Sequence, residues 1–364
     1  MESLVTSPFW QGKKVLITGH TGFKGSWLSL WLLQLGAQVA GLSLEPNTQP
    51  SLFEQLALNQ QLKHHIGDIR DLELVKKVVS QFQPDIVFHL AAQPLVRLSY
   101  SEPVTTWQTN VIGTVNVLES LKTLDQLCVG VMITTDKCYD NKEWIYGYRE
   151  NDPLGGHDPY SSSKAGAEIA IASWAKSFFS QGNIKVVSAR AGNVIGGGDW
   201  AIDRIVPDAM RALSVGKPIP VRNPYATRPW QHVLEPLGGY LTLAQKVYQQ
   251  LVSQKVTIEG AFNFGPNLTS NRNVKELVEE ILKHWQGSWL DYSEPNAVHE
   301  AKLLNLVIDK AFHFLHWKPR WDFAQTIEHT VTWYHQGNQL SPFDTQSYQN
   351  LTLGQIQAYQ ILST

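Results

Sequence analysis

The sequence predicts an α/β protein built on a doubly wound parallel β-sheet, with a smaller mixed α/β lobe attached. Three observations support this fold class. Short apolar runs alternate with helical stretches through the first half of the chain. A glycine-rich turn joins the first apolar run to the first helix. The 364 residues are 43% hydrophobic and 17% charged, so the chain can bury a large core.

The first strand–helix unit spans residues 14–35. Its apolar strand, at residues 15–18, is followed by Gly19, Gly22 and Gly25 in the spacing G-x-x-G-x-x-G, and then by an apolar helix. This arrangement brings backbone N–H groups and a positive helix terminus towards a pyrophosphate. The spacing differs from the better-known G-x-G-x-x-G, so a plain strand–helix turn is the alternative.

The second and third strands are predicted at residues 38–43 and 65–69. In dinucleotide-binding folds an acid near the end of the second strand usually meets the adenosine ribose, and here Ser43 takes that place. No Lys or Arg lies between residues 37 and 62, which favours NAD over NADP, although Lys24 and Arg70 are within possible reach of the adenosine. Asp68 either meets the adenine or caps a helix predicted at residues 72–81.

The fourth and fifth strands are predicted at residues 85–92 and 129–134. The fourth ends in small residues that allow a cofactor to approach closely, and the fifth leads directly into Thr135-Asp136-Lys137. Asn110 lies in a predicted helix between them, where Asn has poor propensity. It is either a buried polar side chain that holds a water or kinks the helix, or an exposed residue. Ligands are expected outside the carboxyl ends of these strands.

Tyr160 and Lys164 open an alanine-rich helix that is predicted to reach about Phe179. Their spacing of four residues places both on one helical face. A nearby ammonium favours the phenolate, which lowers a tyrosine pKa that is about 10 when unperturbed. Such a tyrosine can take a proton from a sugar hydroxyl near neutral pH, while Lys164 can also bind the nicotinamide ribose. The pattern is common by chance, and its position after the fifth strand makes it informative.

Together these motifs resemble those of the extended short-chain dehydrogenases/reductases, a family with a Rossmann-like fold. The resemblance rests on the glycine turn, His89-Leu90-Ala91-Ala92, Asn110, Thr135 and Tyr160-x-x-x-Lys164. Two later stretches, residues 190–200 and 222–233, together with Thr135-Asp136-Lys137, resemble the CDP-glucose 4,6-dehydratase family in particular. This resemblance extends from about Phe9 to Trp317-x-Pro319-x-Trp321.

The resemblance implies an NAD-dependent lyase that acts on CDP-glucose in deoxysugar and O-antigen type (lipopolysaccharide) biosynthesis. The sugar is oxidised at C4, water leaves across C5 and C6, and the hydride returns to C6. By resemblance, Asp136 is the acid for the C6 hydroxyl, Lys137 is the base for C5, and Thr135 bonds the C4 oxygen. A lysine base needs a pKa below its usual value of about 10.4, which burial and nearby cations can produce. A surface ion pair is the alternative for Asp136 and Lys137.

The predicted site has three groups of residues. The catalytic residues are Thr135, Asp136, Lys137, Tyr160 and Lys164. The cofactor-binding residues are Gly19, Thr21, Gly22, Phe23, Lys24, Gly25, Ser43, Asp68, Ile69, Leu90, Ala91, Ala92, Asn110, Thr134, Tyr160 and Lys164. The substrate-binding residues are Gln93, Asn193, Arg204, Arg222, Arg228, Asn263 and His299, with Arg190 as a further candidate. The arginines are included because guanidinium groups bind phosphate bidentately. For Asn193 and Asn263, roles in core turns are the alternative.

The regular strand–helix rhythm is lost after Ala189, where glycines and then prolines interrupt the chain. Residues 1–190 are therefore predicted to form an NAD-binding Rossmann domain, to which residues 226–263 roughly return. Residues 191–225 and 264–364 are predicted to form mainly the substrate lobe. The tryptophans of this half, including Trp285, Trp289, Trp317 and Trp321, are expected in the core, and stacking of one of them on cytosine is the alternative.

Composition limits the other possibilities. A net charge of −2 and a pI near 6.6 argue against a nucleic-acid or membrane-surface partner. Two cysteines offer neither a disulfide framework nor a metal cluster, and the N-terminus has no signal pattern. Glutamine and glycine interrupt the apolar stretch at residues 27–44, so it is not predicted to span a membrane. We therefore expect a soluble cytoplasmic protein without a bound metal.

The expected assembly is a homodimer or a higher homo-oligomer. Alanines at 165, 167, 170, 172 and 175 would let the helix after Tyr160 pack closely on another helix, as the resemblance implies. The main alternative function is an epimerase, or a 4,6-dehydratase for another nucleotide sugar. An epimerase needs no acid–base pair after Thr135. A non-catalytic NAD-sensing protein is a third possibility, but it has no chemical need for both Tyr160 and Lys164.

Overall fold

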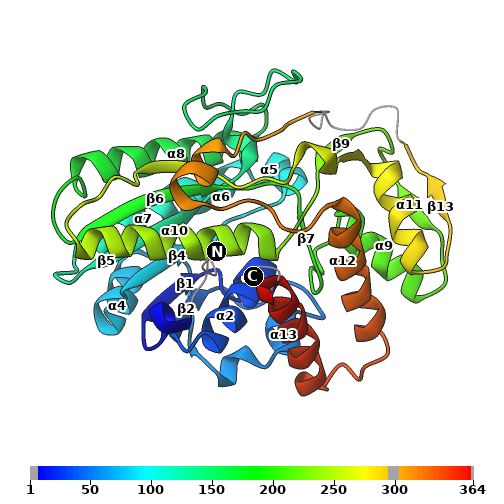
Figure 1. Ribbon diagram of the computed structural model, residues 1–364, viewed down its shortest axis with the longest axis horizontal. Coiled ribbons are helices and arrows are strands. Elements are labelled where there is room, and N and C mark those ends of the chain that lie inside the picture. Colours follow the sequence, from blue (N-terminus) through cyan, green and yellow to red (C-terminus); the bar gives the residue numbers. More distant parts are fainter. Residues whose placement is uncertain (1–6, 294–302, 362–364) are drawn as a thin grey trace.

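The computed structural model describes residues 7–293 and 303–361 (Figure 1). Its centre is a seven-stranded sheet in the order β11-β6-β5-β4-β1-β2-β3, in which all neighbours are parallel. The strands are β1 (Lys14–Thr18), β2 (Gln38–Ser43), β3 (Lys63–Ile66), β4 (Ile86–His89), β5 (Cys128–Ile133), β6 (Ile184–Arg190) and β11 (Gly260–Asn263). The order reverses between β1 and β4, which defines a doubly wound Rossmann-like sheet.

Apolar residues line both faces of this sheet, as a parallel sheet requires. Along β1, Val15 and Ile17 join one core cluster, whereas Leu16 joins the cluster on the opposite face. Every residue of β5 is buried. A strand covered on both sides has no solvent-facing position, which explains why these segments are continuous apolar runs.

Helices cover both faces. On one side α2 (Phe23–Gln34) and α10 (Leu234–Val252) contribute to the larger core cluster, and Figure 1 shows α10 lying across the sheet. On the other side lie α4 (Leu72–Phe82), α7 (Gly113–Leu121) and α8 (Pro159–Ser177). Shorter helical elements are α1 (Ser7–Trp10), α3 (Leu52–Gln55), α5 (Val96–Ser101), α6 (Pro103–Trp107), and the helical turns η1 (Leu58–Gln60), η2 (Gln108–Ile112) and η3 (Asp136–Cys138).

Within residues 7–293 and 303–361, three two-stranded sheets lie outside the main one. They pair β7 (Val194–Ile195) with β10 (Gln231–His232), β9 (Thr227–Pro229) with β12 (Asn271–Asn273), and β8 (Ile219–Val221) with β13 (Trp289–Asp291). With them are α9 (Ile205–Ser214), η4 (Leu268–Ser270), α11 (Val274–His284), η5 (Ala311–Leu315), α12 (Phe323–Gly337) and α13 (Thr345–Ile361). Most of the small strands lie to one side of the main sheet with α9, α11 and α12, at the right of Figure 1. The larger core cluster runs through both predicted regions, so the division into two domains stays a prediction.

Most predicted elements lie close to the observed ones, and the differences have local causes. The second strand has the predicted bounds, while the first helix begins at Phe23, within the glycine turn. The helix predicted at residues 72–81 is α4, and Asp71 caps it by accepting a hydrogen bond from Leu74 N. The alternative in which Asp68 caps this helix is therefore wrong. Asp68 instead pairs with Arg70.

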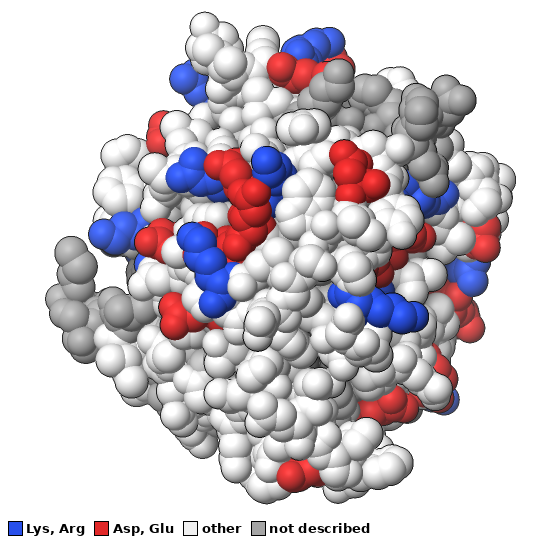
Figure 2. Space-filling view, turned by 90° about the vertical axis from the view of Figure 1, so that its right-hand side faces the viewer, with Lys and Arg blue, Asp and Glu red and all other residues white. Residues whose placement is uncertain are grey.

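Charges are intermixed on the surface. On the face shown in Figure 2, Lys and Arg side chains are interspersed with Asp and Glu side chains and do not gather into one basic area. Pairs such as Arg211–Asp208 and Lys283–Glu280 on α9 and α11 are examples. Among the residues that the structure describes, no helix has the length and hydropathy that a membrane span needs.

A buried carboxyl group joins the C-terminal segments to the body of the protein. Glu235, on α10, is fully buried. One of its oxygens accepts hydrogen bonds from the backbone N of Arg320 (2.9 Å) and Trp321 (2.7 Å), and the other accepts from the Tyr359 hydroxyl on α13 (2.8 Å). Burial raises the pKa of Glu235 to about 7, although these donors oppose the change.

This carboxyl group makes the stability of the protein depend on pH. The pKa of Glu235 is higher in the folded protein than the ordinary glutamate value of 4.5, so its contribution to stability is fully present below pH 4.5 and is lost as the pH rises through about 7. We predict that Glu235→Gln, which keeps an oxygen for the two backbone donors, becomes more stable relative to wild type between pH 5 and pH 8, by on the order of 3 kcal/mol. Urea midpoints at both pH values measure this, with exposed Glu328→Gln as the control. Parallel pH profiles for wild type and Glu235→Gln would contradict the prediction.

Candidate active site

A cleft of about 1470 Å³ opens at the carboxyl ends of the main strands. The glycine turn, the ends of β2 to β5, the start of α8 and the segment from Ala191 to Pro207 contribute to its wall. The predicted residues that line it are Gly19, Thr21, Gly22, Phe23, Lys24, Gly25, Ser43, Asp68, Ile69, Leu90, Ala91, Ala92, Gln93, Thr134, Thr135, Asp136, Lys137, Tyr160, Lys164, Asn193, Arg204 and Arg228. The fold thus brings most of the predicted site together.

The glycine turn between β1 and α2 fits a pyrophosphate. Gly19 has φ +79°, and a Cβ there would lie 2.6 Å from the backbone N of Ala91. A Cβ on Gly25 would lie 2.2 Å from Gly19 O, so both positions require glycine. At Gly22 the nearest atom to such a Cβ is 3.4 Å away, and the absence of a side chain leaves the cleft open beside the start of α2. A helix N-terminus with room beside it is a suitable anion site.

The far end of the cleft is lined by hydroxyl groups and one ion pair. The side chains of Ser43 and Thr21 share a hydrogen bond of 2.7 Å. Asp68 accepts hydrogen bonds from the Arg70 guanidinium, at 2.9 Å and 2.6 Å, and these bonds hold the pKa of that carboxyl below its usual range. Arg70 is thereby engaged by a carboxylate, which makes it a less suitable partner for a 2′-phosphate.

Asn110 supports the cleft from behind. It is fully buried in η2, a π-helical turn, so the exposed alternative is wrong. Its side chain accepts from Gln93 N (2.8 Å) and donates to Gln93 O (3.1 Å) and to the Ser163 hydroxyl (2.9 Å). Asn110 therefore ties the loop after β4 to α8, and the cleft-lining residues do not include it. The Gln93 side chain is itself engaged by Leu95 and Thr106.

The segment after β5 presents the candidate acid and base. The Thr135 hydroxyl donates to Asp136 Oδ1 (3.0 Å), and Asn193 Nδ2 donates to Asp136 Oδ2 (3.2 Å). Asp136 is 1% exposed and Lys137 is half-buried, so a surface ion pair does not describe them. Sequence reasoning missed the part played by Gly192, where a Cβ would lie 1.9 Å from Asp136 Oδ2. Its position beside Asn193 was the available signal.

Tyr160 and Lys164 lie side by side along α8, and both are buried. Burial raises the pKa of Tyr160 to about 12, and a hydrogen bond with Thr135 opposes this effect. Burial lowers the pKa of Lys164 to about 8, and its ammonium donates to Ile133 O at 3.4 Å. The expected lowering of the Tyr160 pKa by Lys164 is therefore wrong for this structure. Desolvation outweighs it, and Thr135 is the polar neighbour of the phenol.

Positively charged side chains lie near the acid. Lys24 reaches the same part of the cleft as Asp136, and burial followed by the charge of Arg204 lowers its pKa to about 8. Arg204 itself donates to Asp199 at 2.8 Å. These groups and Lys164 give this end of the cleft a positive character that suits an anionic ligand.

Three of the predicted substrate-binding residues are not seen in the wall of the cleft. Two of them bind other protein groups, and the third lies outside the residues that the structure describes. Arg222 pairs with Asp203 (2.6 Å) and Asp208 (3.5 Å) and is not among the described residues that line the cleft. Asn263 is fully buried and bonds Tyr139, Tyr148 and Val307, which favours the core role. His299 lies outside the described residues.

Arg190, the further candidate, forms a buried ion pair with Glu168 at 2.7 Å. It does not line the cleft among the described residues, so a phosphate-binding role is not supported.

The doubly wound sheet, the glycine turn after β1 and the Tyr160–Lys164 pair beside Thr135 define an extended short-chain dehydrogenase/reductase. The sequence model described as GDP-mannose 4,6 dehydratase matches residues 16–330, so the chain belongs to that family. It is 48% identical to CDP-glucose 4,6-dehydratase of Salmonella typhimurium, over 91% of this chain and 93% of the relative. It is 26% identical to dTDP-glucose 4,6-dehydratase of Haemophilus influenzae, over 88% and 97% of the two chains.

Solved structures share the fold. A dTDP-glucose 4,6-dehydratase from Bacillus anthracis in complex with NAD has a TM-score of 0.73 at 22% identity, covering 90% of this chain and 98% of its own. A UDP-glucose 4-epimerase from Brucella ovis in complex with NAD has a TM-score of 0.74 at 19% identity, covering 89% and 98%. At these identities the likeness establishes the fold.

Proposed function

We propose that the protein is an NAD-dependent CDP-glucose 4,6-dehydratase, which converts CDP-D-glucose into CDP-4-dehydro-6-deoxy-D-glucose and water. The observation that carries this proposal is the meeting of Tyr160 and Lys164 with Asp136 and Lys137 in one cleft. The 48% identity to a CDP-glucose 4,6-dehydratase supports the nucleotide. An epimerase, the alternative, oxidises and reduces C4 without needing an acid and a base for elimination.

When bound, NAD⁺ accepts a hydride from C4 of the sugar and returns it to C6. Tyr160 takes the proton of the C4 hydroxyl, and Thr135 hydrogen bonds the C4 oxygen. The C4 ketone acidifies C5–H, from which Lys137 removes the proton, and Lys137 returns a proton to C5 when the hydride reaches C6. Asp136, held by Asn193 and Thr135, gives a proton to the C6 hydroxyl, which leaves as water. Lys164 would orient the cofactor ribose, and with Lys24 and Arg204 it supplies positive charge at this end of the cleft.

The cleft also supports the assignment of the other ligand contacts. The glycine turn and α2 would hold the cofactor pyrophosphate, and Arg204 and Arg228 are the candidates for the substrate diphosphate. The two-domain division remains part of this proposal, with residues 1–190 as the cofactor-binding region. We further propose a cytoplasmic location and a role in deoxysugar and lipopolysaccharide biosynthesis, in keeping with a nucleotide-sugar substrate.

A homodimer is the proposed minimum assembly, but its basis differs from the alanine pattern. Ala165 and Ala167 are buried within the subunit itself. The neighbouring surface of α6, η2 and α8 instead exposes large apolar side chains, namely Val104 (68% exposed), Trp107 (43%), Ile112 (51%) and Ile169 (61%). Apolar side chains in such numbers on adjacent helices are typical of a surface that a second copy covers.

The two halves of the proposed reaction should separate on mutation. Asp136→Asn deletes the proton donor for the C6 hydroxyl, so elimination of water should fall about 10²- to 10⁴-fold while oxidation at C4 persists. Tyr160→Phe should abolish both steps. Lys137→Met should suppress exchange of the C5 hydrogen with solvent deuterium. Rapid-quench and absorbance measurements with CDP-glucose and NAD⁺, without added reductant, test these outcomes. Wild-type product rates in both Asp136→Asn and Lys137→Met would refute the assigned roles.

Cofactor binding should depend on the backbone of the glycine turn. Gly25→Ala places a Cβ against Gly19 O, which is backbone and can move only if the turn opens. We expect affinity for NAD⁺ to fall at least about tenfold, the equivalent of 1.4 kcal/mol. Calorimetric titration measures it, with Gly354→Ala on α13 as the control because nothing lies within 4 Å of its Cβ. Unchanged affinity in Gly25→Ala would contradict the role of the turn.

NAD⁺ should also give a higher kcat/KM than NADP⁺.

The proposed dimer surface is tested by placing a charge on it. Ile169→Glu should shift the protein from dimer towards monomer, because a buried carboxylate without a partner is unfavourable. Phe343→Glu is the control, since Phe343 is 89% exposed and lies on a different part of the chain. Light scattering at micromolar concentration reports the mass. A wild-type monomer, or a dimer unaffected by Ile169→Glu, would refute the surface.

A further inference from the structure

A buried ion pair lies behind the cleft, between α8 and β6. Glu168 and Arg190 have side chains that are 3% and 4% exposed, and their N–O distance is 2.7 Å. The Glu168 carboxylate also accepts hydrogen bonds from the hydroxyl groups of Thr134 and Ser188, the latter at 2.9 Å. The proposed mechanism assigns this pair no chemical step.

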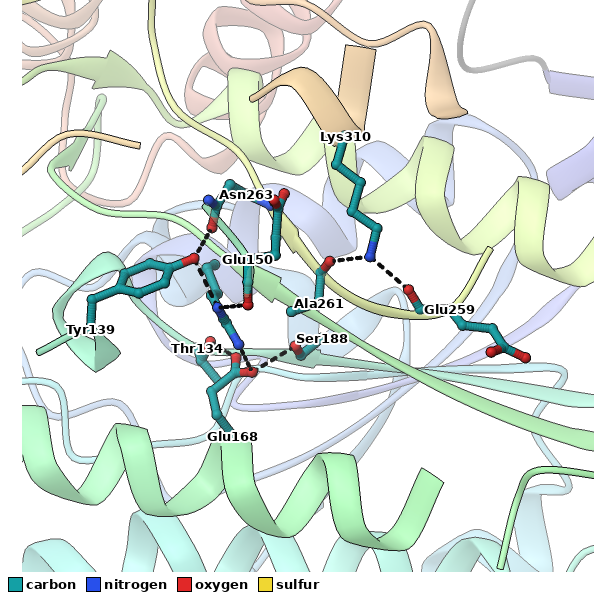
Figure 3. Close-up of polar contacts among 10 residues, drawn as sticks. Thr134, Tyr139, Glu150, Glu168, Ser188, Glu259, Ala261, Asn263 and Lys310 are labelled. Carbon is teal, nitrogen blue, oxygen red and sulfur yellow. Dashed lines mark hydrogen bonds and ion pairs between the residues drawn. The ribbon is translucent and has the colours of Figure 1, made fainter. Parts of the chain in front are cut away.

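The guanidinium extends the network to the other side. Arg190 Nη1 donates to the Tyr139 hydroxyl (2.8 Å) and to the backbone O of Glu150 (3.0 Å). The Tyr139 hydroxyl donates in turn to Asn263 Oδ1 (2.7 Å), and Figure 3 draws this hydrogen bond as a dashed line. Thr134 therefore contacts the glutamate of this ion pair, and Tyr139 contacts its arginine.

These two contacts flank the acid–base segment. Thr134 directly precedes residues 135–138 and Tyr139 directly follows them. The backbone hydrogen bonds of this segment are long. They measure 3.4 Å from Cys138 N to Thr135 O and 3.5 Å from Tyr139 N to Asp136 O. Hydrogen bonds at such distances are weak, so the turn depends on contacts outside itself for a fixed position.

The network also contacts β11, the strand at one edge of the main sheet. Glu150 accepts from the backbone N of Asn263 (2.9 Å), and the Lys310 ammonium donates to the backbone O of Glu259 and Ala261 (2.8 Å each). Figure 3 shows the contacts of Lys310 with Glu259 and Ala261. Because β11 pairs with β6, and β6 carries Arg190, the ion pair and its partners are joined to the main sheet.

We propose that the Glu168–Arg190 ion pair is a positioning element that fixes Asp136 and Lys137 for elimination by holding both ends of residues 135–138. The inference rests on the proposed dehydratase function. A buried ion pair contributes little to stability on average, whereas a displacement of about 1 Å at reacting groups can cost about 10²-fold in rate. The ion pair therefore acts mainly by fixing the positions of Asp136 and Lys137, and little by stabilising the fold.

Two nearly isosteric variants test the two ends. Thr134→Val removes the hydroxyl that reaches Glu168, and Tyr139→Phe removes the one that reaches Arg190 and Asn263. Each should slow elimination about ten- to a hundredfold, and should affect C4 oxidation and the KM for CDP-glucose by a much smaller factor. In a single turnover, the decay of absorbance at 340 nm should therefore be slowed far more than its rise, and quenched samples should show delayed product.

Matched variants separate positioning from stability. Thr134→Ser keeps the hydroxyl and should restore elimination. Tyr348→Phe deletes another buried hydroxyl, which donates to Gly337 O at 3.0 Å, and it should lose stability without slowing elimination. The inference is overturned if Thr134→Val and Tyr139→Phe eliminate at the wild-type rate, if Thr134→Ser is as slow as the valine variant, or if Tyr348→Phe is slowed equally. A wild-type protein that makes no product would instead refute the proposed function.

Discussion

The parallel pairing of β1, β4 and β5 is the constraint on which the site depends, because it brings the carboxyl ends of these three strands together on one side of the sheet. The glycine turn follows β1, Ala91 and Ala92 follow β4, and the acid–base segment follows β5. The contact of Gly19 with the backbone of Ala91 is close enough to exclude any side chain. Helix α8 lies against the same edge and carries Tyr160. The chemistry is therefore assembled by backbone packing.

Desolvation is the second physical theme of the site. Burial lowers the pKa of both Lys24 and Lys164 to about 8, and it raises the pKa of Tyr160 to about 12. Each change disfavours the charged form, so an anionic ligand that enters the cleft compensates part of the cost of burying the cations. A substrate with a diphosphate suits this environment. Asp136 lies near these cations and is held in place by Asn193.

The sequence was sufficient for the main elements and for most of the cleft. Apolar runs and the turn chemistry are local properties, so strands such as Gln38–Ser43 and the site at the strand ends could be predicted. Contacts between distant residues could not. The hydrogen bond between Tyr139 and Asn263 joins residues 124 positions apart, and the partner of Arg190 is a glutamate on another element. The pKa of Tyr160 likewise depends on burial, which the spacing of Tyr160 and Lys164 does not reveal.

The most direct test follows the hydrogen at C4 of the sugar. A dehydratase that keeps the hydride in its cleft should convert CDP-glucose carrying deuterium at C4 into a product carrying that deuterium at C6. Mass spectrometry and NMR of the product locate the label, with NAD⁺ added and no reductant supplied. Deuterium at C6, with none in free NADH, is the predicted result. Label retained at C4 of an epimerised sugar, or released into free NADH, would contradict the account.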